Sequence, residues 1–70
     1  SRNVSGEIRG AAFIIQYAIK LGIKELDLYY DYRGIEEFYT ALIKQARIYH
    51  YSIMILPIKQ KNKLKLIFTK

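Results

Sequence analysis

The sequence predicts a small α/β domain in which helix, strand, helix and strand follow one another and the two strands form a parallel pair. Two segments have the apolar spacing of helices, two alternate apolar with polar residues, and 70 residues suit a single domain. With 51% hydrophobic residues, the chain does not belong to the disordered class. We expect the pair to be parallel because a long helical crossover joins its strands.

Residues 5–21 are predicted to form the first helix. Ser5 is placed to cap its start, and Gly22 is placed to end it. The apolar residues that give the helical spacing are Ile8, Ala11, Ala12, Ile15, Ala18 and Ile19.

A strand and a second helix are predicted to follow. Residues 23–30 alternate leucines with acidic residues, which is the period of a strand with two unlike faces. Residues 35–49 return to helical spacing, with Glu36 and Glu37 in the first turn, where the helix dipole favours acids.

The last third of the chain is harder to interpret. The apolar run at residues 51–58 fits a buried strand or a continued helix, and Pro57 is poorly tolerated inside either. We favour a broken helix here. Residues 59–63 then predict a polar connector, and residues 64–69 alternate as a final strand.

Charge is divided unevenly along the chain. All six acidic residues lie within residues 1–37 beside five basic ones, whereas residues 38–70 hold seven basic residues and no acidic one. A segment with a net charge of +7 attracts polyanions, so nucleic acid is the expected partner. The alternative is a solvated basic face that keeps a small protein soluble.

Several classes of protein are disfavoured by what the sequence lacks. The chain has no cysteine, which excludes disulfide scaffolds and cysteine zinc sites. No apolar run approaches the roughly 20 residues that cross a bilayer, and no secretory leader is recognisable. We expect a cytoplasmic protein with no membrane partner.

Two carboxylates stand out by position. Glu7 lies at the start of the first helical pattern, and Asp31 closes the first strand pattern. Carboxylates so placed can share one metal ion, which suggests phosphodiester chemistry. Alternatively, Glu7 complements the helix dipole and Asp31 is a turn or cap residue. Asp27 is a conceivable further ligand, although a solvated strand acid is the preferred interpretation.

Two stretches resemble the ribonuclease H family: residues 3–11, NVSGEIRGA, and residues 28–35, LYYDYRGI. The similarity is closest to bacterial ribonucleases H that carry an added hybrid-binding (viroplasmin-type) domain. Residues 63–70, KLKLIFTK, are similar to the last strand of that fold. The resemblance implies that residues 1–70 are the helix-strand-helix-strand portion of a ribonuclease H-like domain, without its opening three-stranded meander and its C-terminal helix.

The resemblance also implies an activity and a site. Members of this family hydrolyse the RNA strand of RNA–DNA hybrids, using four carboxylates around two Mg²⁺ ions, with Mn²⁺ as a possible substitute. Glu7 and Asp31 match two of these catalytic metal ligands. The other two would lie in the missing regions, so we expect an internal fragment that is inactive alone.

Nucleic-acid contacts follow in part from the resemblance. Asn3 matches an asparagine that contacts the hybrid, whereas Arg33 stands where the family commonly has glutamine. Lys59 and Lys61 are further candidates for phosphate contacts, or else belong to a plain basic connector. The only histidine, His50, is interpreted as a helix-surface residue rather than a catalytic one.

Three functional hypotheses therefore remain. The chain is part of a ribonuclease H-type endonuclease, a non-catalytic basic module that binds nucleic acid, or a piece that folds only when another segment or chain supplies the missing strands.

Overall fold

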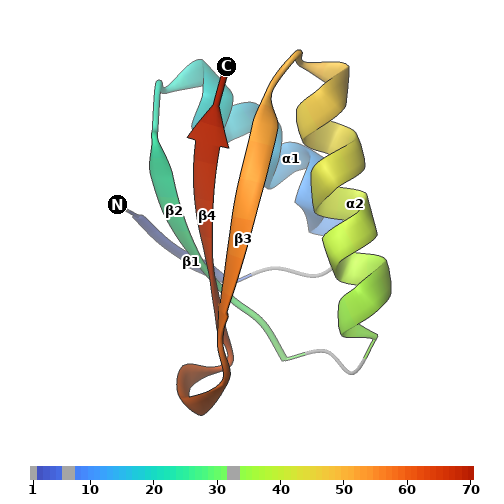
Figure 1. Cartoon of the computed structure of the whole chain (residues 1–70), viewed down its shortest axis with the longest axis vertical. Coiled ribbons are helices and arrows are strands. Elements are labelled where there is room, and N and C mark those ends of the chain that lie inside the picture. The colour runs from blue at the N-terminus through green and yellow to red at the C-terminus, as the bar shows by residue number, and fades with distance from the viewer. Residues whose placement is uncertain (1, 6–7, 32–33) are drawn as a thin grey trace.

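The computed structural model describes the backbone of residues 2–5, 8–31 and 34–70, and the side chains from residue 10 onward within these ranges. Four strands form one sheet, and both helices cover the same face of it (Figure 1). In chain order the elements are β1 (Arg2–Ser5), α1 (Ile8–Lys20), β2 (Glu25–Tyr29), α2 (Ile35–Ile48), β3 (Ser52–Ile58), the 3₁₀ helix η1 (Lys59–Lys61) and β4 (Lys63–Thr69).

The sheet has the strand order β1-β2-β4-β3. Its main part is antiparallel, because β4 lies between β2 and β3 and runs opposite to both. The short strand β1 lies beside β2 and is parallel to it, with Ser5 opposite Tyr29.

The predicted parallel pair between residues 23–30 and 64–69 is wrong. Leu26 of β2 lies opposite Leu66 of β4 in antiparallel register. The error arises at residues 51–58, where Ser52–Ile58 form β3 rather than part of a broken helix. After the α2 crossover it is β3 that takes the direction of β2, and the hairpin then turns β4 back between them.

Pro57 is tolerated in β3 because its nitrogen points to the free edge of the sheet and not toward β4. Tyr30 N–H donates to the Asn62 carbonyl at 3.0 Å, and Phe68 N–H donates to the Lys24 carbonyl at 2.9 Å. Hydrogen-bonding direction alternates along a strand, so Leu64 also bonds toward β2. Pro57 lies opposite Leu64, and its nitrogen therefore points to the free edge, where no ladder bond is lost.

The helix predictions are largely confirmed. The second helix, α2, has Glu36 and Glu37 in its first turn as expected. The first, α1, begins at Ile8, and the predicted capping role of Ser5 is wrong because its backbone belongs to β1. Gly22 ends α1 with φ of +70°, a left-handed conformation that favours glycine.

One apolar layer between the helices and the sheet holds the fold together. Alternate residues of β2 and β4 point into it, as the period-two pattern predicts. The buried residues are Ala11, Ile15, Ala18, Leu26, Leu28, Phe38, Leu42, Ala46, Leu64, Leu66 and Phe68. Within the described residues, neither helix is long and apolar enough to cross a membrane.

Candidate functional site

The strands that lead to the two candidate carboxylates end side by side. In the parallel register of β1 and β2, Ser5 lies opposite Tyr29. Asp31 follows Tyr29 by two positions and is exposed to solvent. Glu7 follows Ser5 by the same number of positions but lies outside the described residues. The chain thus leaves both strands at the same end of the sheet.

The β3–β4 hairpin turns at this same end. The bond from Tyr30 N–H to the Asn62 carbonyl joins the end of β2 to the hairpin loop. Asn62 adopts a left-handed conformation with φ of 46°, which closes the loop after η1. Figure 1 shows the hairpin loop at the end of the sheet. Lys59 and Lys61 are exposed in this loop. The end that carries Asp31 therefore also carries two of the predicted phosphate-binding lysines.

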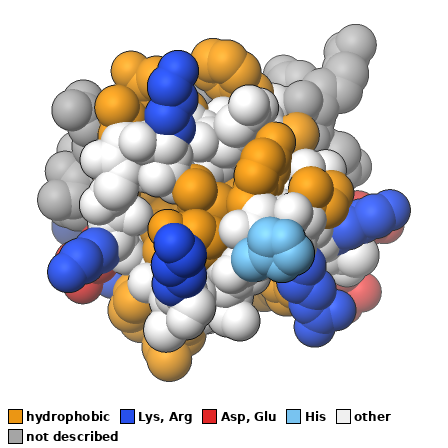
Figure 2. Space-filling model, turned by 90° about the horizontal axis from the view of Figure 1, so that it is seen from above, with side chains coloured by type: hydrophobic (Ala, Val, Ile, Leu, Met, Phe, Trp, Pro, Cys, Tyr) orange, Lys and Arg blue, Asp and Glu red, His pale blue; other side chains and the backbone are white. Residues whose placement is uncertain are grey.

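The remaining predicted contacts are only partly described. Asn3 belongs to β1 and lies opposite Asp27, but its side chain is outside the described residues. Arg33 is outside them entirely. His50 is exposed beyond the C-terminal end of α2, near the start of β3. His50 therefore lies at the end of the sheet away from Asp31. Figure 2 shows the His50 end, where basic and apolar side chains are interspersed.

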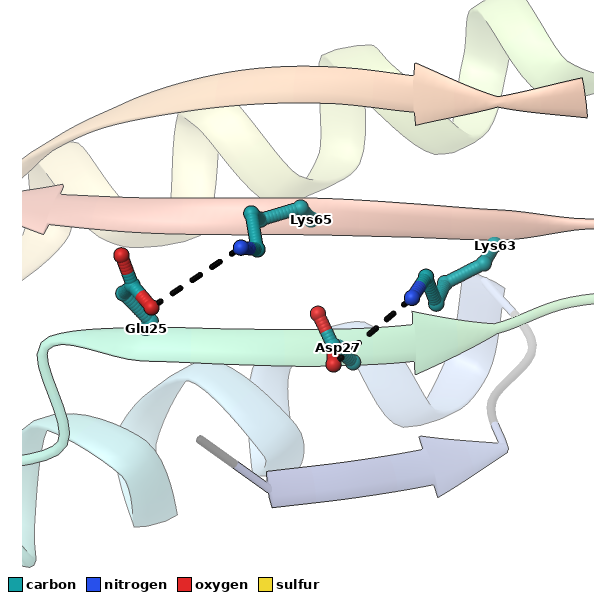
Figure 3. Close-up of polar contacts among 4 residues, drawn as sticks. All are labelled: Glu25, Asp27, Lys63 and Lys65. Carbon is teal, nitrogen blue, oxygen red and sulfur yellow. Dashed lines mark ion pairs between the residues drawn. The ribbon is translucent and has the colours of Figure 1, made fainter.

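Asp27 is held by a lysine rather than solvated as predicted. Its Oδ2 atom lies 3.8 Å from Lys63 Nζ, and each of the two side chains is only 13% exposed (Figure 3). Its Oδ1 atom is buried and has no hydrogen-bond partner within the part of the chain that the structure describes. Lys63 also lies over the Tyr29 ring, 6.0 Å from its centroid. Asp27 is thus a structural ion-pair residue and not a free metal ligand.

A second ion pair lies one step along the same face of the sheet. Lys65 Nζ is 3.9 Å from Glu25 Oε2, and both side chains are more exposed than those of the first pair (Figure 3). Sequence reasoning counted Lys63 and Lys65 in the basic segment and missed that acids of β2 neutralise both. The strand alternation carried the signal, because these lysines and acids occupy the same face once β2 and β4 are neighbours.

The described residues do not complete a two-metal centre. Within them, no group of three or more histidine, cysteine or acidic side chains is placed to hold a metal ion. They supply one candidate ligand, Asp31, to which Glu7 would add a second. Two carboxylates suit one hydrated cation, whereas the family that the sequence resembles uses four for two ions.

Comparison with known proteins gave no match to a family model, to a curated protein or to a solved structure. The resemblance to ribonuclease H stays a prediction from residues 3–11 and 28–35.

Proposed function

We propose that this chain is part of a ribonuclease H-type endonuclease that hydrolyses the RNA strand of RNA–DNA hybrids, and that Glu7 and Asp31 are its metal-binding carboxylates. The observation that supports this is the parallel register of β1 and β2, in which Ser5 lies opposite Tyr29. It brings the segments that precede Glu7 and Asp31 to one end of the sheet. The antiparallel pairing of β2 with β4 is not a feature of that family's fold and does not support the proposal.

The chemistry requires oxygen ligands that remain charged and accessible. Magnesium takes such ligands at about 2.0–2.1 Å and keeps several of its waters. When bound, the ions activate a water molecule and stabilise the departing oxygen. The Asp31 carboxylate is exposed, so it can accept a hydrated cation without breaking an ion pair within the described residues. With two carboxylates of four, binding is expected to be weak and hydrolysis absent.

Metal binding is tested with Mn²⁺, whose unpaired electrons broaden nearby amide signals in nuclear magnetic resonance spectra. Millimolar Mn²⁺ should broaden the signals of Tyr30 and Asp31 in the unmodified chain. The variants Asp31→Asn and Glu7→Gln should each lose this effect. Glu25→Gln is the matched control, because it removes an acid at the start of β2, about 20 Å from Asp31 along the strand.

Unchanged broadening in Asp31→Asn would refute the assignment of that ligand. A cleavage assay with a labelled RNA–DNA hybrid and Mg²⁺ should show no hydrolysis by the chain alone. Robust hydrolysis abolished by Asp31→Asn would show that the site is more complete than two carboxylates.

A non-catalytic nucleic-acid-binding module is the second candidate. It is favoured by the basic residues that have no ion pair with another described residue, which are Lys20, Lys24, Lys44, Arg47, Lys59, Lys61 and Lys70. They are not confined to the Asp31 end, so they suit contacts to phosphates without regard to a metal site. Equal binding of duplex DNA and hybrid without metal would favour this candidate, whereas hybrid preference that requires Mg²⁺ and Asp31 would favour the first.

A further inference from the structure

The outer edge of β3 carries backbone groups that are available for pairing. β3 is the last strand on its side of the sheet, with β4 as its neighbour. Backbone groups of alternate residues in a strand point the same way, so the N–H groups of Ile53 and Ile55 point to the free edge, as the Pro57 nitrogen does. In the β3–β4 register these two N–H groups point away from β4, and no turn, loop or cap bond within the described residues uses them. The edge therefore offers two donors and the carbonyls beside them.

This edge is protected against strand pairing only near its C-terminal end, by Pro57. Edge strands are commonly shielded by charged side chains, proline, short length or bulges, and N-terminal to Pro57 the strand has no charge and no proline. Residues 51–58 contain no charged residue, although the chain has a net charge of +6. On the sheet face away from the helices, Met54 is 57% exposed and Leu56 is 41% exposed. β1, on the other side of the sheet, has 4 residues against 7 in β3.

We propose that a second copy of this chain pairs its β3 antiparallel to this edge, about a two-fold axis at Met54, so that the two sheets become continuous. In this register Ile53 lies opposite the partner's Ile55, and each copy both donates and accepts at these positions. Pro57 lies opposite the partner's Tyr51, just before β3 begins, where its missing N–H costs no strand bond. A register centred on Ile55 would instead press the proline ring against the partner's Ile53 carbonyl.

A second copy suits this edge better than a charged partner strand. The strand is uncharged and apolar along its length, so a strand of the same composition meets it without like-charge repulsion. The two Met54 side chains would lie together across the axis on the outer face, where each is exposed in the single chain. The positive charge elsewhere on each copy opposes association, so added salt should strengthen the dimer.

Disulfide trapping tests the register, because the chain has no cysteine of its own. Residues facing each other in a non-hydrogen-bonded antiparallel pair have Cα atoms about 4.5 Å apart, within disulfide reach. Under mild oxidation, Met54→Cys should form a covalent dimer at least about tenfold faster than Leu56→Cys, whose two copies would lie about 13 Å apart. Both positions are exposed on the same face, so random collision should crosslink them at similar rates.

Sedimentation and hydrogen exchange test the unmodified chain. It should shift from monomer to dimer as concentration rises, and Met54→Lys should stay monomeric while keeping its circular dichroism spectrum. Dimerisation should slow amide exchange at Ile53 and Ile55, whereas Met54 and Leu56, bonded to β4, should be protected at every concentration. A monomer at all concentrations, open-ended aggregates, or equal crosslinking of the two cysteine variants would overturn the proposal.

Discussion

The two faces of β4 show how one strand serves two different purposes. On the face toward the helices, Leu64 and Leu66 are fully buried. On the face away from the helices, Lys63 and Lys65 form ion pairs with Asp27 and Glu25 of the neighbouring strand β2. Burial of apolar area holds the helices on one face, while paired charges occupy the other. The number of lysines in the second half of the chain therefore overstates the positive charge available to a polyanion.

The largest effect is expected from shortening a side chain on the helix-covered face. Leu66 is 0% exposed, so Leu66→Ala should lower the free energy of unfolding by about 2–5 kcal/mol. Ile67, its neighbour on the outer face, is only partly buried, and Ile67→Ala should cost about 1 kcal/mol or less. Urea denaturation of the two variants measures the difference. Equal losses would mean that the outer face is also covered in solution, and the contrast between the faces would fail.

A smaller effect should separate the two ion pairs of the outer face. Asp27→Asn leaves Lys63 mostly buried without its counter-charge and should cost about 1–3 kcal/mol. Glu25→Gln breaks the more exposed pair with Lys65 and should cost between about 0 and 1 kcal/mol, a loss that high salt should erase. Thermal or urea unfolding at low and high salt measures both. A larger loss for Glu25→Gln would reverse the assigned importance of the pairs.

Local periodicity was sufficient for the parts of the fold that have two unlike faces. It predicted both helices and the strands at residues 23–30 and 64–69, which the structure has at Glu25–Tyr29 and Lys63–Thr69, because buried and exposed positions recur there with the period of each element. It failed for β3, since an apolar run with a proline fits a strand only if that strand is at an edge and the proline nitrogen faces outward. The whole sheet determines which edge is free and in which direction β4 runs. Neither can be predicted from the local pattern of one segment.

The candidate site was predictable to the same extent. The position of Asp31 just beyond a strand end follows from the alternation pattern alone. The partners of Asp27 and Glu25 did not follow, because Lys63 and Lys65 lie far away in sequence and face them only across the β2–β4 register. Charge counted along the chain cannot show which charges neutralise one another across a sheet.

The smallest predicted effect concerns how far the helix-covered layer extends toward the Asp31 end. Partial burial raises the pKa of Tyr39 above its ordinary value of 10.0, and the nearby Tyr30 hydroxyl adds to the shift. The folded state therefore retains the Tyr39 proton more tightly than the unfolded state does. The stability that this provides is complete below about pH 10 and is lost as the pH rises from there through the raised pKa.

Tyr39→Phe should remove this part of the alkaline loss while leaving stability near neutral pH almost unchanged. Urea midpoints at about pH 8 and about pH 10.5 measure the slope in the two proteins. If Tyr39→Phe and the unmodified chain lose stability equally with rising pH, water reaches the Tyr39 hydroxyl. The helix-covered layer would then end before the Asp31 end of the sheet.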